Sequence, residues 1–93
     1  MWSFIKNWHN WLIQRQLETD LDRLLNHMEE VARHASRWLC MADHDSYARH
    51  QVMMAVAGIE AGLVCLQKTL PLCRKGFQEK AGRRLRFMVA LME

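Results

Sequence analysis

Structure-breaking residues are scarce in this chain of 93 residues, which has one proline and four glycines. Such low contents exclude collagen-like repeats and flexible Gly/Pro linkers. Hydrophobic residues make up 51% of the chain and charged residues 25%, a balance that excludes an intrinsically disordered or acidic-tail protein. A chain of this length is expected to form one small domain, residues 1–93, with a thin core.

Catalytic motifs are missing as well. The sequence has no glycine-rich phosphate loop, no nucleophile elbow and no CxxC pair. Its three cysteines, Cys40, Cys65 and Cys73, cannot all pair within one chain, and it does not begin with a signal-peptide pattern. The longest apolar stretch, residues 52–66, contains Glu60 and is shorter than the roughly 20 residues that cross a bilayer. We therefore expect a non-enzymatic, cytoplasmic protein that does not span a membrane and has no cofactor.

Two groups of potential metal ligands have helical spacing. His27, Glu30 and His34 fall on one side of a predicted helix, but a di-iron bundle requires Glu followed three residues later by His, twice. Cys40 and His44 are four residues apart, without a second ligand pair beside them. Solvated polar side chains explain both groups better, so we predict no metal site.

Two ladders of apolar residues follow the spacing of a single helical face, with steps of four and three residues. Between them lies a polar turn near residues 42–46, where Asp45 or Ser46 can cap the second helix. The first ladder consists of Leu17, Leu21, Leu24, Met28, Val31, Ala35 and Trp38, and the second of Val52, Val56, Ile59, Leu63, Leu66 and Leu70.

Folding the chain at this turn brings the two ladders into one register. Ala35 then faces Val52, Met28 faces Ile59, and the two members of each pair are equally far from the turn. Two matched apolar faces joined by a short loop are what an antiparallel helical hairpin requires. The sequence therefore predicts such a hairpin over residues 17–70.

The predicted second helix is apolar around most of its circumference. Beside its ladder runs a stripe of small residues, Ala55, Gly58, Gly62 and Cys65. Glycine inside a helix costs about 1 kcal/mol relative to alanine, so we expect another helix to approach closely over Gly58 and Gly62. One hairpin mate covers only one face, and the remaining apolar surface predicts further helices from this chain or from a second molecule.

Aromatic residues gather in residues 1–16, which we predict to form an amphipathic helix. Its apolar arc is turned by about half a circle from the ladder that begins at Leu17. Either the chain bends between Gln14 and Thr19, where Thr19 begins a weak capping box, or this helix packs on something other than its hairpin mate. The arc can fold back onto the second helix, which we favour, or bind a protein partner. A membrane surface ranks third, because the polar face has few basic residues. The aromatic residues are Trp2, Phe4, Trp8 and Trp11.

Basic residues are concentrated at the other end of the chain. Residues 68–93 contain seven Lys/Arg and two Glu, whereas residues 1–45 contain five Lys/Arg and seven Asp/Glu. Pro71 ends the second helix, and a third amphipathic helix is predicted over residues 73–93. Its basic side is either solvated or binds an anionic partner, although it lacks the interleaved aromatics of single-strand binders. The basic residues are Lys75, Lys80, Arg83 and Arg86, with Arg84 at the border.

These patterns predict an all-α protein: an aromatic N-terminal helix, a long antiparallel hairpin and a basic C-terminal helix. We expect a protein-interaction module, a regulator, adaptor or inhibitor that docks on a larger assembly or on itself, such as a phage or mobile-element modulator of host machinery. The alternatives are a non-specific nucleic-acid-binding protein that uses the basic helix and a peripheral membrane protein that uses the aromatic helix. The predicted partner-binding residues are Trp2, Phe4, Trp8, Trp11, Lys75, Lys80, Arg83, Arg84 and Arg86.

Overall fold

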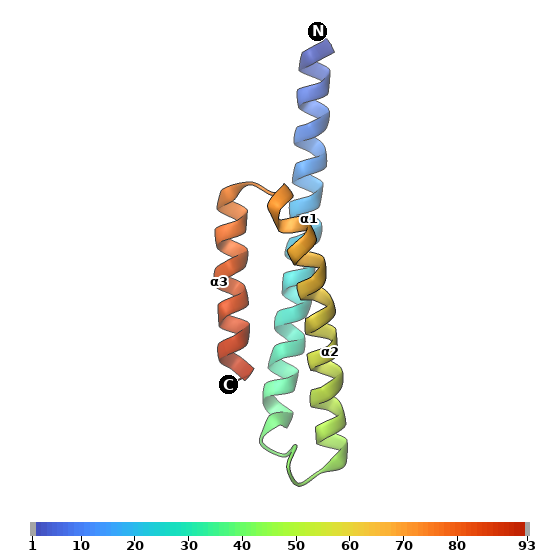
Figure 1. Cartoon of the computed structure of the whole chain (residues 1–93), viewed down its shortest axis with the longest axis vertical. Helices are drawn as coiled ribbons and strands as arrows, with labels where there is room; N and C mark the ends of the chain where they lie inside the picture. The colour runs from blue at the N-terminus through green and yellow to red at the C-terminus, as the bar shows by residue number, and fades with distance from the viewer. Residues whose placement is uncertain (1, 93) are drawn as a thin grey trace.

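The computed structural model describes residues 2–92 and confirms the all-α prediction (Figure 1). Its elements are α1 (Trp2–Leu39), α2 (Ser46–Thr69), the 3₁₀ turn η1 (Leu70–Leu72) and α3 (Lys75–Met92). The radius of gyration is 17.1 Å and the molecule measures 66 × 19 × 16 Å. A compact chain of this length would have a radius of gyration of about 12 Å, so the described residues form a rod.

Helix α1 is the spine of the rod. Helices α2 and α3 both pack along it, whereas α2 and α3 make few contacts with each other over residues 2–92. Helix α2 runs antiparallel to α1, and α3 turns back to run in the same direction as α1 (Figure 1). The core lies where the three helices meet and includes Leu25, Met28, Leu66, Ala81 and Met88.

The hairpin turn is close to the predicted position, between the end of α1 at Leu39 and the start of α2 at Ser46. Asp45 caps α2 as expected, because its Oδ1 accepts hydrogen bonds from the backbone N–H groups of Tyr47 at 2.8 Å and Ala48 at 3.4 Å. These bonds satisfy N–H groups that have no partner within the helix. A short polar sequence is therefore sufficient to reverse the chain.

The register of the hairpin is also close to the predicted one. Near the turn, the rings of Trp38 and Tyr47 meet edge to face with their centroids 5.5 Å apart. One helical turn further along, the His34 Nε2 and Gln51 Oε1 atoms are 3.2 Å apart. Both pairs lie within a few residues of the predicted pairing of Ala35 with Val52.

The faces that pack together agree only in part with the predicted ladders, of which Leu21, Met28, Ala35 and Leu66 are buried. Leu24 and Val31 are only half-buried, because α1 must cover α3 as well as α2 and its core face is centred between the two. On α2 the predicted ladder residue Leu63 is 41% exposed. The residues buried on α1 are Glu18, Leu21, Leu25, Met28, Ala32 and Ala35, and those on α2 are Ala48, Ala55, Gly62 and Leu66.

The small-residue stripe of α2 was therefore only partly interpreted correctly. Gly62 does lie under a close contact, but the neighbour is the hairpin mate α1 through Met28, and no additional helix is needed. At Gly58 the prediction of a close contact is wrong, because an added Cβ would meet no atom within 4 Å. The small residue Gly62 thus allows α1 to approach closely, and of the bulkier ladder Leu66 is buried while Leu63 is 41% exposed.

Of the two alternatives for the N-terminal segment, the bend between Gln14 and Thr19 is wrong, because α1 continues from Trp2 to Leu39 without a break at residue 16. Thr19 does not cap a new helix. Its hydroxyl donates a 2.9 Å hydrogen bond to the Arg15 carbonyl one turn earlier, a bond that a threonine makes inside a helix. The third helix likewise begins at Lys75 instead of residue 73, after η1.

The start of α3 is fixed to α1 by an ion pair between Glu18 and Arg74. Glu18 is 7% exposed, and its carboxylate lies 2.6 Å from the Arg74 Nη2. It also accepts hydrogen bonds from the Arg74 Nε and backbone N–H. These hydrogen bonds lower the pKa of the Glu18 carboxyl, against the opposing effect of its burial. The pair thus joins α1 to the chain segment between η1 and α3.

Candidate partner-binding surfaces

Residues 2–13 of α1, here called the aromatic arm, extend beyond the other helices (Figure 1). Every residue of the arm is exposed, and at 1.5 Å per residue it is about 18 Å long. The favoured prediction, that the aromatic arc folds back onto α2, is wrong: Phe4 is 73% exposed and Trp8 56%. A continuous α1 leaves these side chains beyond the reach of α2. Trp2 and Trp11 are exposed as well.

Heptad spacing determines which side of the molecule the arm presents. Trp8 is two heptads from Asp22, which binds Arg84 of α3 at 2.9 Å. Trp11 is one heptad from Glu18, which binds Arg74 at the start of α3. Residues seven apart lie on nearly the same side of a helix, with a drift of about 20° per heptad. Phe4, Trp8 and Trp11 therefore continue the rows of α1 against which α3 packs, whereas Trp2 lies in a different heptad row with His9.

A cationic notch lies where the arm meets the rest of the molecule. It has a volume of about 230 Å³ and is lined by Trp11, Gln14, Arg15 and Arg74. The Arg15 guanidinium lies 5.2 Å from the centre of the Trp11 ring, in a cation–π contact. The Gln14 side-chain amide donates a 3.3 Å hydrogen bond to the Leu72 carbonyl. The Gln14 hydrogen bond joins α1 to η1 at the base of the arm.

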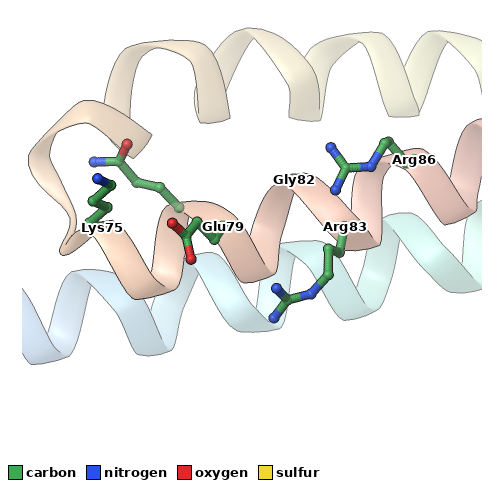
Figure 2. Close-up of a pocket in the computed structure, with 6 residues that line it drawn as sticks. Lys75, Glu79, Gly82, Arg83 and Arg86 are labelled. Atoms are coloured by element: carbon green, nitrogen blue, oxygen red, sulfur yellow. The ribbon is translucent and has the colours of Figure 1, made fainter.

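The outer side of α3 carries a second, basic surface. Figure 2 shows Lys75, Glu79, Arg83 and Arg86 along a shallow hollow, with the two guanidinium groups diverging. Within residues 2–92, Lys75, Arg83 and Arg86 form no ion pair, whereas Lys80 is 3.8 Å from the Asp22 carboxylate. The unpaired charges of this surface therefore come from three of the five basic residues predicted on α3.

Arg84 has an internal role that the sequence did not indicate. Its side chain is 17% exposed and lies between α3 and α1. It donates hydrogen bonds to Asp22 at 2.9 Å and to Glu29 at 3.4 Å, and it also contacts the Asn26 side-chain oxygen. These interactions join α3 to α1, so Arg84 does not belong to the exposed basic surface of α3.

The predicted polar flank of α1 faces α2 in part. His34 is hydrogen-bonded to Gln51 across the hairpin, and a groove lined by His27, Glu30, His34 and Gln51 runs beside it. Within residues 2–92, no three His, Cys, Asp or Glu side chains are placed to hold a metal ion. The structure thus gives His34 a role in the hairpin.

The outer face of α2 is apolar and largely uncovered. Met53, Met54 and Val64 are each more than half exposed on it. By length and composition the segment Ser46–Leu72 could cross a membrane, and 17% of its most apolar window is buried. Glu60 lies within this segment, and a carboxylate in the bilayer core costs about 3 kcal/mol.

Comparison of the chain with protein-family models, curated proteins and solved structures gives no match.

Proposed function

We propose that this chain is a non-enzymatic protein-interaction module that docks on a larger protein through the aromatic arm. A regulator, adaptor or inhibitor, such as a phage or mobile-element modulator of host machinery, would act in this way. The observation that carries the proposal is the projection of residues 2–13, in which Trp2, Phe4, Trp8 and Trp11 are all exposed on a helix. Large exposed apolar patches on small proteins mark interaction sites.

Two further physical points support this proposal. Tryptophan is enriched among the residues that contribute most to binding at protein interfaces, and the arm has three tryptophans within twelve residues. The arm is also part of a helix whose remaining turns are held by α2 and α3. A partner would therefore meet a helix that is already formed, which lowers the entropy lost on binding.

Affinity capture with paired variants tests the proposal. The full chain is immobilised, proteins retained from a lysate of the source cells are identified, and their dissociation constants are then measured with purified partner. Trp8→Ala is expected to weaken binding by about 2 kcal/mol or more, because it removes a large apolar contact at the centre of the arm.

Met53→Ala is the matched control, because Met53 is 65% exposed and lies on α2, away from the arm. It is expected to change the dissociation constant by less than about twofold, as surface substitutions outside an interface do. Equal weakening by the two variants, or no retained protein whose binding depends on Trp8, would contradict the proposal.

The basic surface of α3 supports a second candidate function, non-specific nucleic-acid binding. Lys75, Arg83 and Arg86 form no ion pair with residues 2–92 and lie on one exposed side of one helix. Binding through them would weaken steeply with salt, because bound phosphates release counterions. Fluorescence anisotropy with labelled DNA at several salt concentrations tests this function, and the variant Arg83→Glu with Arg86→Glu should abolish most of the signal. Glu79 among the cations reduces the positive potential of the surface.

A further inference from the structure

The arm and the cationic notch form one continuous surface on a single side of α1. The heptad row that contains Trp8 continues to Arg15, whose guanidinium lies over the ring of Trp11. The next positions along the same rows are Glu18 and Asp22, which already bind α3. These rows thus form one long helix-binding face on α1, here called the seat. Helix α3 covers the part of the seat from Glu18 onward, and the part on the arm is uncovered (Figure 1).

We propose that the open part of this seat accepts an acidic amphipathic helix of a partner protein, lying on the arm roughly in line with α3. This inference rests on the proposed function and specifies the partner's chemistry. The partner's apolar face would cover Phe4, Trp8 and Trp11, and its carboxylates would face the cationic notch at Arg15. A helix is the occupant that fits, since the same rows of α1 already hold the helix α3.

Charge selects an acidic partner. Between Trp2 and Leu17 the chain has no Asp or Glu, and Arg15, which lies in the same heptad row as Trp8, is positive. Arg15 forms no ion pair within residues 2–92, and Arg74 is 65% exposed while it binds Glu18. The positive end of the α1 dipole lies at the same end of the rod. A carboxylate at the notch would give Arg15 the partner that it lacks.

The same charges disfavour a second copy of this chain on the arm. If two arms packed antiparallel, the positive N-terminal end of one α1 would lie near Arg15 and Arg74 of the other. No carboxylate of either arm would offset this repulsion, because the first acidic residue of the chain, Glu18, is already bound to Arg74. Self-association through the arm is thus electrostatically unfavourable.

A pair of designed peptides tests the proposal with the intact chain. Each peptide is about 14 residues long, is held in a helix by a covalent side-chain staple, lacks tryptophan, and has leucines at heptad spacing on one face. The acidic peptide has glutamate at its remaining positions, and its control has lysine there. Binding is followed by the tryptophan fluorescence of the protein, which is expected to shift to shorter wavelength with the acidic peptide only.

Two variants locate the site. Trp8→Ala is expected to weaken binding of the acidic peptide at least about tenfold. Arg15→Glu is expected to weaken it about fivefold or more and to give the lysine peptide measurable affinity. Arg23→Glu is the charge-matched control. Arg23 is exposed and has no ion pair within residues 2–92. It lies two turns beyond Arg15 along α1, which is farther from the notch than the Debye length of about 8 Å. The affinity for the acidic peptide should therefore change less than twofold.

Equal binding of the two peptides, or binding of neither, would overturn the inference. Vesicles of phosphatidylcholine with phosphatidylglycerol are tested as a third binding partner. Binding of the vesicles but not of the acidic peptide would assign the arm to a membrane surface and would also contradict the proposed function. A captured protein whose binding depends on Trp8, together with no binding of the acidic peptide, would leave the proposed function standing and refute the acidic helix.

Discussion

Met28 of α1 lies directly over Gly62 of α2. A Cβ atom at position 62 would lie 2.6 Å from the Met28 Sδ and 3.1 Å from its Cγ and Cε. Carbon atoms do not approach sulfur so closely, so the glycine is what allows the two helices to meet at this point of the hairpin. Met28 itself is almost fully buried in the core.

Replacing Gly62 with leucine should therefore destabilise the protein. The new side chain would push Met28 out of the core or separate the helices, at a cost of about 1–3 kcal/mol. Gly58→Leu is the control on the same helix, because nothing lies within 4 Å of its added Cβ. It should be neutral or stabilise by up to about 1 kcal/mol through helix propensity. Urea unfolding followed by circular dichroism measures both, and equal effects would contradict the contact.

The hairpin was predictable because its signals are local and repeat along the chain. The ladders, the polar turn and the Asp45 cap each point to the same antiparallel pair. The faces were less predictable, because Leu63 and Gly62 are both compatible with a core position on an apolar helix. In the structure Gly62 lies against Met28 and Leu63 is 41% exposed, a rotation of α2 that its apolar pattern alone does not specify.

The Glu18–Arg74 ion pair predicts how stability depends on pH. Its hydrogen bonds hold the pKa of Glu18 in the folded protein below the ordinary value of 4.5. A group with a lowered pKa stabilises the fold at pH values above 4.5, where it is ionised in both states. That stabilisation should disappear as the pH falls from about 4.5 through the folded-state pKa. Thermal unfolding from pH 7 to pH 2 should show the loss.

Glu18→Gln is the control for this pH dependence. It keeps the shape of the side chain but removes the charge, so the melting temperature should fall at pH 7 and change less between pH 5 and pH 3 than that of the parent chain. If parent and variant lose stability in parallel over this range, the pair does not contribute as proposed.

These ion pairs explain what sequence reasoning missed at the candidate surfaces. Glu18 and Arg74 are 56 residues apart, and Arg84 and Asp22 are 62 apart. Periodicity along one helix contains no information about a charge on another. A weak signal did exist, since Glu18 and Asp22 flank Leu21 in the apolar ladder. Carboxylates beside a core face are the positions at which a basic third helix would bind.

Arg84 and Arg83 offer a comparison of a paired and an unpaired arginine on neighbouring positions. Arg84→Met should destabilise by about 1.5–3 kcal/mol, since it breaks hydrogen bonds to the carboxylates of Asp22 and Glu29. Arg83→Met should stay within about 0.5 kcal/mol of the parent chain, because Arg83 is exposed and has no ion pair within residues 2–92. Amide hydrogen exchange should locate the effect of Arg84→Met in α3, and faster exchange confined to α2 would contradict this role.

The three cysteines should differ in reactivity. Cys73 is buried at the end of η1, and its thiol lies 3.7 Å from the Thr69 carbonyl. Burial, with a smaller contribution from the negative charge of Glu18, raises the pKa of the Cys73 thiol, so less of the reactive thiolate forms. Cys40 and Cys65 are exposed. At pH 8, iodoacetamide should modify Cys73 at least about tenfold more slowly than the other two, as measured by mass spectrometry of peptides.

In urea all three should react at similar rates, and Glu18→Gln should accelerate the reaction of Cys73 in the folded protein. Modification of Cys73 in the folded protein as fast as that of Cys40 would show that the junction between η1 and α3 is not packed against α1.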